Sequence, residues 1–134
     1  MLQIISGVTD CKRIDAEGQP DISLRWKGGP PILVECKNSL RVTYADGRPK
    51  VDFQRTRASV SDPCSRYYAP TYFPVLAACL HAVTEEWEFR LALTSELPVH
   101  KKCDGRIASA VAVVEPKFSR DAEIVFDKCS GLEY

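Results

Sequence analysis

The sequence predicts an α/β (α+β) fold, in which a mixed central β-sheet is flanked by helices. Three observations predict it: strand-like segments outnumber helical ones, the two kinds are interspersed, and 134 residues suffice for one core but not comfortably for two. Apolar residues at 45% and charged residues at 27% are ordinary for a globular protein. We therefore expect residues 1–134 to form a single domain.

Hydrophobic periodicity and turn residues predict the individual elements. The first eight residues are too few for a full amphipathic helix, and Asp62-Pro63 ends the helical pattern of residues 51–61. Apolar and polar residues alternate with strand period along residues 87–94. In chain order, the pattern predicts a strand at 20–26, a turn-rich bridge at 27–31, a strand at 31–38, a polar loop or hairpin arm at 41–50 around Asp46 and Gly47, a helix at 51–61, an aromatic loop at 65–73, an apolar run at 75–83, a strand at 87–94, a strand at 107–114 and a short helix at 119–128.

Composition also limits the class of protein. The longest apolar runs are too short to cross a bilayer and no secretory leader is recognisable, so we expect a soluble, intracellular (cytoplasmic) protein. Eighteen basic side chains balance 18 acidic ones, so any tight DNA binding is expected to draw on another domain, a partner or a homodimer.

Six widely spaced cysteines form no CxxC pair, which favours reduced and partly buried thiols over a disulfide framework. Cys79, His81, His100 and Cys103 are potential zinc ligands, but neither half makes a strong motif, so no zinc site is predicted.

The strands at 20–26 and 31–38 are expected to pair as an antiparallel hairpin. Pairing Trp26 with Ile32 across the bridge makes one face of the hairpin wholly apolar. On the other face, this register brings Asp21 opposite Lys37, with Glu35 diagonal to Asp21 and still within reach of a shared ion. The pattern therefore predicts two carboxylates and a lysine on one solvent-exposed face.

These three side chains suit phosphodiester chemistry. Carboxylate oxygens from neighbouring strands prefer Mg²⁺ or Mn²⁺, ions that also accept phosphate oxygens and water as ligands. The backbone carbonyl of Cys36 is a further candidate ligand beside Asp21 and Glu35. A lysine nearby can hold the attacking water and screen negative charge.

Pro20-Asp21, thirteen intervening residues and Glu35-Cys36-Lys37 resemble the motif of the PD-(D/E)xK nuclease superfamily, a resemblance that covers roughly residues 18–60. It implies a restriction-endonuclease-like fold and Mg²⁺-dependent DNA cleavage that leaves a 5′-phosphate and a 3′-hydroxyl. In such a site Asp21 and Glu35 hold the metal and Lys37 assists the water. Gln54 occupies the place of a glutamine that many members carry on the next helix.

The chain departs from the family in having little room for an initial helix with a further acid, for which Asp10, Asp15 or Glu17 would be weak substitutes. This departure suggests a fragment of a longer protein.

The predicted function is that of a DNA endonuclease of restriction or defence type. Arg55 and Arg57 follow the motif directly and are candidate phosphate contacts, with a solvated helix face as an equal alternative. Two other functions stay open: an inactive nuclease-like module for DNA binding or assembly, and a structure-selective nuclease such as a junction resolvase. The residues of the aromatic loop, which are Arg66, Tyr67, Tyr68, Tyr72 and Phe73, could contact DNA bases, although its prolines favour core packing.

Overall fold

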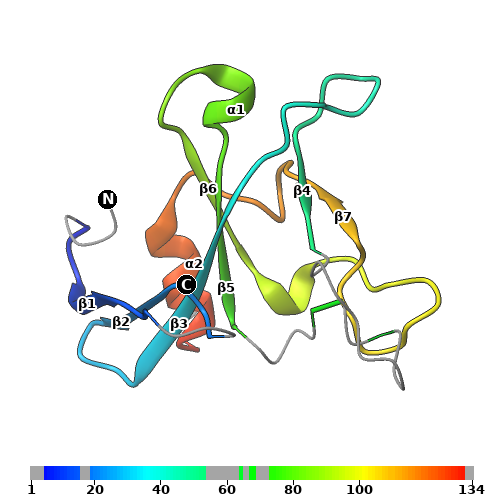
Figure 1. Cartoon of the computed structure of the whole chain (residues 1–134). Helices are drawn as coiled ribbons and strands as arrows, with labels where there is room; N and C mark the ends of the chain where they lie inside the picture. Colours follow the sequence, from blue (N-terminus) through cyan, green and yellow to red (C-terminus); the bar gives the residue numbers. More distant parts are fainter. Residues whose placement is uncertain (1–4, 16–18, 54–63, 65–66, 69–72, 132–134) are drawn as a thin grey trace.

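The computed structural model describes residues 5–15, 19–53, 64, 67–68 and 73–131. Within these ranges the chain forms two sheets and two α-helices, which confirms the predicted α+β class (Figure 1). The elements are β1 (Val8–Arg13), β2 (Ile22–Trp26), β3 (Pro31–Asn38), β4 (Lys50–Asp52), β5 (Val75–Cys79), α1 (His81–Thr84), β6 (Phe89–Leu93), the 3₁₀ turn η4 (Thr94–Glu96), β7 (Ala110–Ala112) and α2 (Ala122–Cys129).

The larger sheet has the strand order β1-β2-β3-β5-β6. Its central pair, β3 and β5, is parallel, whereas the other neighbours are antiparallel. Every residue of β5 is buried. Its continuous apolar run is typical of a strand that is covered on both faces of the sheet. The parallel register pairs Asn38 with Cys79, so β3 and β5 end at the same edge of the sheet.

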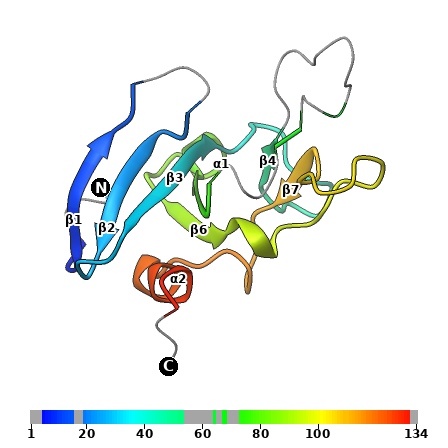
Figure 2. The ribbon, with the colours of Figure 1, turned by 90° about the horizontal axis from the view of Figure 1, so that it is seen from below.

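A separate apolar core covers each face of this sheet. On one face, Val34, Val75 and Leu91 pack against Val125 and Phe126 of α2. On the other face, the small β4–β7 sheet and the chain around it add their apolar side chains to those of β5 and β6. Figure 2 shows α2 on one side of the large sheet, whereas β4 and β7 lie well away from α2.

Helix α2 is fixed at its start and near its end. Asp121 caps it by accepting a hydrogen bond from the backbone N–H of Glu123 at 3.0 Å. Asp127 is 3% exposed and accepts a hydrogen bond of 2.7 Å from Nε1 of Trp26, which anchors α2 to β2. Lys27 adds an ion pair to the same carboxylate at 3.3 Å.

Most predicted strands are confirmed, but one predicted helix is wrong at its start and one strand was not predicted. Residues 20–26, 31–38 and 87–94 contain β2, β3 and β6, and the turn around Asp46 and Gly47 is formed. The helix predicted at 51–61 starts as a strand instead, because β4 pairs with β7 and Val51 is buried in the core. The rest of that segment, residues 54–61, lies outside the described residues. The chain start also supplies β1, which the sequence did not predict because its exposed, charged residues alternate poorly with apolar ones.

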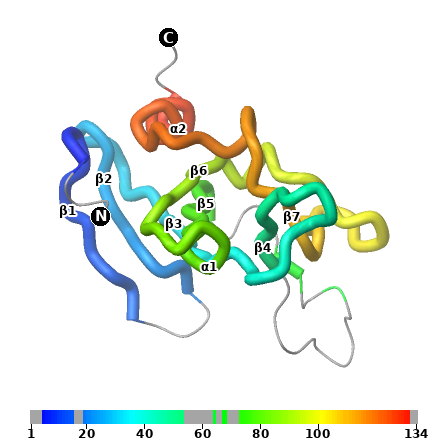
Figure 3. The backbone as a smooth tube through the Cα atoms, turned by 90° about the horizontal axis from the view of Figure 1, so that it is seen from above, coloured from blue at the N-terminus to red at the C-terminus, as the bar shows by residue number. Residues whose placement is uncertain are grey.

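Helix α1 is a single turn between β5 and β6 and lies at the end of the sheet where β3 also ends (Figures 1 and 3). No helix among the described residues is both long and apolar enough to span a bilayer.

Candidate active site

The candidate site is built on the β2–β3 hairpin, whose register differs by two residues from the predicted one. Leu24, not Trp26, pairs with Ile32. The carbonyl of Trp26 already accepts the N–H of Gly29 at 2.9 Å, so the turn begins at Trp26 and the ladder cannot extend to it. A shift by two residues leaves every side chain on its predicted face.

The corrected register also changes which residue of β3 would lie opposite Asp21. Ile22 pairs with Val34, so one further step in the same register puts Asp21 opposite Glu35 instead of Lys37. Directly opposite residues on one face have Cβ atoms about 5 Å apart, whereas diagonal neighbours are farther apart. Asp21 itself lies in the bend just before β2, so its place opposite Glu35 is a continuation of the register and not a ladder pair.

Asp21 is held on both its backbone and its side chain. Its carbonyl accepts the N–H of Ile14 at 2.8 Å, and its Oδ2 accepts the backbone N–H of Cys36 at 2.9 Å. The carboxylate is thus tied to the residue between Glu35 and Lys37. This contact joins the two halves of the motif.

The face that carries Glu35 is only partly exposed to solvent, since Leu33 and Lys37 are half-buried, and this corrects the prediction. Glu35 is only 9% exposed, and its neighbour Leu33 packs against the core beneath the β4–β7 sheet. The prediction failed because the local pattern does not show that residues 50–52 fold back as strand β4 over this face.

Lys37 lies on the same face and points its ammonium at two aromatic rings. Its Nζ is 4.7 Å from the ring centre of Tyr68 and 5.8 Å from that of Phe53. Tyr68 in turn packs edge-on against Phe53 and Phe73. The expectation that the aromatic loop packs as core is therefore confirmed for Tyr68 and Phe73.

A cleft of about 680 Å³ opens at the end of the sheet beside Asp21. We call it the end cleft, and its lining includes Cys11, Arg13, Asp21, Cys36, Trp87 and Phe89. Burial raises the pKa of the Cys36 thiol to about 11, and the negative charges of Asp21 and Glu35 add to this effect. The thiol is therefore protonated at neutral pH.

Two of the six cysteines form a disulfide, whereas free thiols were expected at all six. Cys64 and Cys103 form a disulfide with their Cα atoms 5.6 Å apart, a pairing that their separation of 39 residues gave no reason to predict. His100 Nδ1 accepts the backbone N–H groups of Lys102 and Cys103. His81 stacks on Trp87 with ring centres 4.1 Å apart.

Among the residues that the structure describes, no three His, Cys, Asp or Glu side chains gather closely enough to hold a metal ion. Gln54, Arg55 and Arg57 lie outside the described residues, as do Glu17, Arg66 and Tyr72. Asp10 pairs with Arg25 at 3.4 Å.

Three charged or aromatic residues that line the end cleft, Lys12, Arg13 and Trp87, were not predicted as site residues. Arg13 belongs to the unpredicted strand β1. Trp87 was taken as part of the alternating strand, whereas it precedes β6 and is 74% exposed. Its position among Glu85, Glu86 and Glu88 was the available signal, since a run of charges is typical of an exposed turn.

No family model and no curated protein sequence matches the chain. Among solved structures, its backbone is similar to that of a bacterial homing endonuclease, with a TM-score of 0.49 and 20% sequence identity. The match covers 82% of this chain and 65% of that chain, which is less than two thirds of its length. At this level of similarity, the function has to be argued from the side chains described above.

Proposed function

We propose that the chain is a Mg²⁺-dependent DNA endonuclease of the PD-(D/E)xK type, acting in restriction or another form of defence. The observation that carries the proposal is the hydrogen bond from the Cys36 N–H to Asp21 Oδ2, at 2.9 Å, within a hairpin whose register, continued by one step past Ile22, would put Asp21 opposite Glu35. A chance tripeptide on an ordinary strand would not need a fixed aspartate from the neighbouring strand.

The donor set fits a small, hard cation in part. Asp21 and Glu35 supply carboxylate oxygens, and Mg²⁺ commonly takes only one or two protein carboxylates and completes its shell with water and phosphate oxygens. When bound, such an ion activates water and offsets negative charge on the phosphate. Mn²⁺ is expected to substitute.

Pro20 gives a physical reason for the proline of the motif. Two steps beyond the Ile22–Val34 pair, the register sets Pro20 opposite Cys36. The N–H and C=O of one strand residue point to the same neighbour, so the Cys36 carbonyl faces β2 as its N–H does. Proline has no N–H to donate to that carbonyl. We infer that the Cys36 carbonyl serves as a further oxygen ligand, next to Asp21.

The remaining roles follow from charge and hydrogen-bonding capacity. The Lys37 ammonium carries donors only, so it can orient the attacking water and screen the phosphate but cannot bind a cation. Its contacts with the Tyr68 and Phe53 rings fix where that positive charge lies. We assign Gln54 to water positioning and Arg55 and Arg57 to the flanking phosphates, each from its place directly after β4 in the sequence.

The test is nicking of supercoiled plasmid by the purified chain with Mg²⁺, Mn²⁺, Ca²⁺ or EDTA. We expect cleavage with Mg²⁺ and Mn²⁺, and none with EDTA. Asp21→Asn and Glu35→Gln should abolish it, while Asp104→Asn, a matched change at an exposed position, should leave it unchanged.

Circular dichroism of each variant separates loss of chemistry from loss of fold. Cleavage by both carboxylate variants at the wild-type rate, with the fold intact, would refute the assignment. So would equal cleavage in Mg²⁺ and in EDTA.

A further inference from the structure

The end cleft joins the candidate active site to an exposed aromatic ring. Asp21 and Cys36 form part of its lining, and Trp87 and Phe89 form another part. Its volume of about 680 Å³ lies within the range of small-ligand sites in proteins. A group bound in this cleft would therefore lie next to Asp21 and Lys37, two of the residues proposed to cut DNA, because Lys37 also forms part of the lining.

Trp87 is held in place although it is exposed. Its ring stacks on His81 at 4.1 Å with an angle of 23° between the planes, and 74% of the residue is accessible. Glu85, two residues before it, has a left-handed backbone with φ of 61°, and the Glu88 carbonyl accepts the Leu80 N–H at 2.8 Å. These contacts close the turn between α1 and β6, so the indole is presented by a fixed backbone.

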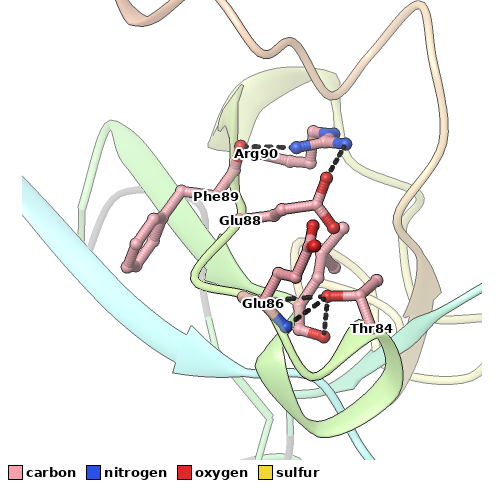
Figure 4. Close-up of polar contacts among 6 residues, drawn as sticks. Thr84, Glu86, Glu88, Phe89 and Arg90 are labelled. Atoms are coloured by element: carbon pink, nitrogen blue, oxygen red, sulfur yellow. Dashed lines mark hydrogen bonds and ion pairs between the residues drawn. The ribbon is translucent and has the colours of Figure 1, made fainter.

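Side-chain contacts reinforce this turn (Figure 4). Thr84 Oγ1 accepts the backbone N–H of Glu86 at 3.2 Å. The Glu88 carboxylate is directed at Arg90, 3.7 Å away, on the other side of the strand from the Phe89 ring. The negative charge of Glu88 therefore faces a cation and not the end cleft that Phe89 lines.

The opposite wall of the cleft is basic. Lys12 and Arg13 of β1 both contribute to the lining, and Arg13 pairs with Ile22, the residue that follows Asp21. An aromatic platform facing two cations matches a nucleotide, whose base stacks on the ring while its phosphate meets the cations.

The base that such a platform accepts must be unpaired. In a duplex, each base is stacked between its neighbours and offers no free face, whereas single-stranded DNA presents every base to an aromatic side chain. The chain has no net charge, so its total charge gives DNA binding no general electrostatic gain. Stacking supplies binding energy that does not depend on net charge.

Building on the proposed function, we propose that the end cleft binds an unpaired segment of the DNA substrate, with a base on Trp87 and its phosphate at Lys12 and Arg13. The substrate class is then DNA with single-stranded or branched regions beside the scissile bond. Fully paired linear duplex is then the poorer substrate, so this inference favours the structure-selective alternative over cleavage of the restriction type.

The experiment measures binding in EDTA, where no metal-dependent cleavage occurs, by fluorescence anisotropy of labelled oligonucleotides. The probes are a 12-nucleotide thymidine oligomer and a blunt duplex of the same strand length. We expect the single strand to bind at least about tenfold more tightly than the duplex. Trp87→Ala should weaken single-strand binding about 5- to 100-fold, in line with the loss of one stacked base. Trp87→Phe should restore most of it.

Matched controls separate stacking and charge from general effects. Val99→Ala, at another exposed apolar position, should leave affinity unchanged. Arg13→Ala should lower the salt slope by about 0.7, the value for one phosphate of a single strand, whereas Arg48→Ala should not. Trp26 is 2% exposed, so iodide quenching reports Trp87, and bound single strand should protect it.

Equal affinity for duplex and single strand, or unchanged affinity in Trp87→Ala, would overturn the inference. Binding of an apolar dye in the cleft without protection of Trp87 by DNA would overturn it as well. None of these outcomes bears on metal-dependent nicking of plasmid, so the proposed function is tested separately.

Discussion

Replacement of Lys37 by methionine removes the ammonium of the candidate site and keeps an apolar stem of similar length. In the folded chain that ammonium lies 4.7 Å from the ring centre of Tyr68 and 5.8 Å from that of Phe53. A cation over an aromatic ring contributes about 0.5–1 kcal/mol at a partly exposed site. Losing the contacts with both rings should lower the free energy of unfolding by about 1–2 kcal/mol. For a chain of this size, that lowers the melting temperature by roughly 3–8 °C.

The expected effect of Lys37→Met on catalysis is much larger than its effect on stability. Removing one group that acts on transition-state charge typically costs about 10²–10³ in rate. Metal binding should persist, because an ammonium has no lone pair to offer a cation and its removal takes away a repulsive charge. Glu35→Gln, in contrast, should weaken both cleavage and metal binding.

The assay combines single-turnover plasmid nicking in Mg²⁺ with isothermal titration of Mn²⁺ in the presence of DNA. Lys101→Met, at an exposed position, is the matched control and should cut at the wild-type rate. If Lys37→Met loses Mn²⁺ affinity as severely as Glu35→Gln, the division of roles is wrong. If it nicks at the wild-type rate, the assignment of Glu35-Cys36-Lys37 as a catalytic motif fails.

Three further predictions concern the framework of the site. Asp127→Ala leaves the buried Trp26 N–H without its acceptor and should lower the free energy of unfolding in urea by about 1–3 kcal/mol. Asp127→Asn should lower it less, and equal losses in the two variants would contradict the hydrogen-bond argument. Reduction of the Cys64–Cys103 disulfide should lower that free energy by about 4 kcal/mol, since the bridge spans 39 residues, and an unchanged urea midpoint in dithiothreitol would contradict this. The pKa of the Cys36 thiol is raised to about 11, so its contribution to stability is fully present below about pH 9 and is lost as the pH rises through about 11. The melting temperature of Cys36→Ser should therefore fall less steeply than that of the wild type over this pH interval. Parallel melting curves for the two proteins between pH 8 and 11 would argue against it.

The local pattern of the sequence was sufficient to predict the hairpin and its faces. Period-two alternation identified β2 and β3 and set Glu35 and Lys37 on one side, because face assignment depends only on parity along the strand. The register was missed by two residues, since the exact point at which the turn begins depends on Trp26 packing against α2. That contact joins residues distant in sequence.

Nonlocal pairing explains the other errors. The local sequence pattern around Lys50–Asp52 predicts a helix, but the segment forms a strand because it pairs with β7. The burial of Glu35 and the disulfide of Cys64 with Cys103 depend likewise on chain segments that meet only in the fold. Metal binding and the roles of Gln54, Arg55 and Arg57 stay predictions.

The parallel pairing of β3 with β5 has a consequence for the order in which the protein folds. The hairpin contact of Leu24 with Ile32 closes a short loop, whereas Val34 and Val75 must meet across the whole intervening chain. The extra loop-closure entropy is about 1.4 kcal/mol. The strand that holds Glu35 therefore gains its partner on the Asp21 side early, and its other edge pairs late. We expect the two acids to become neighbours before the core that fixes Lys37 exists, so a nascent or partly unfolded chain would carry the carboxylate pair without a positioned lysine.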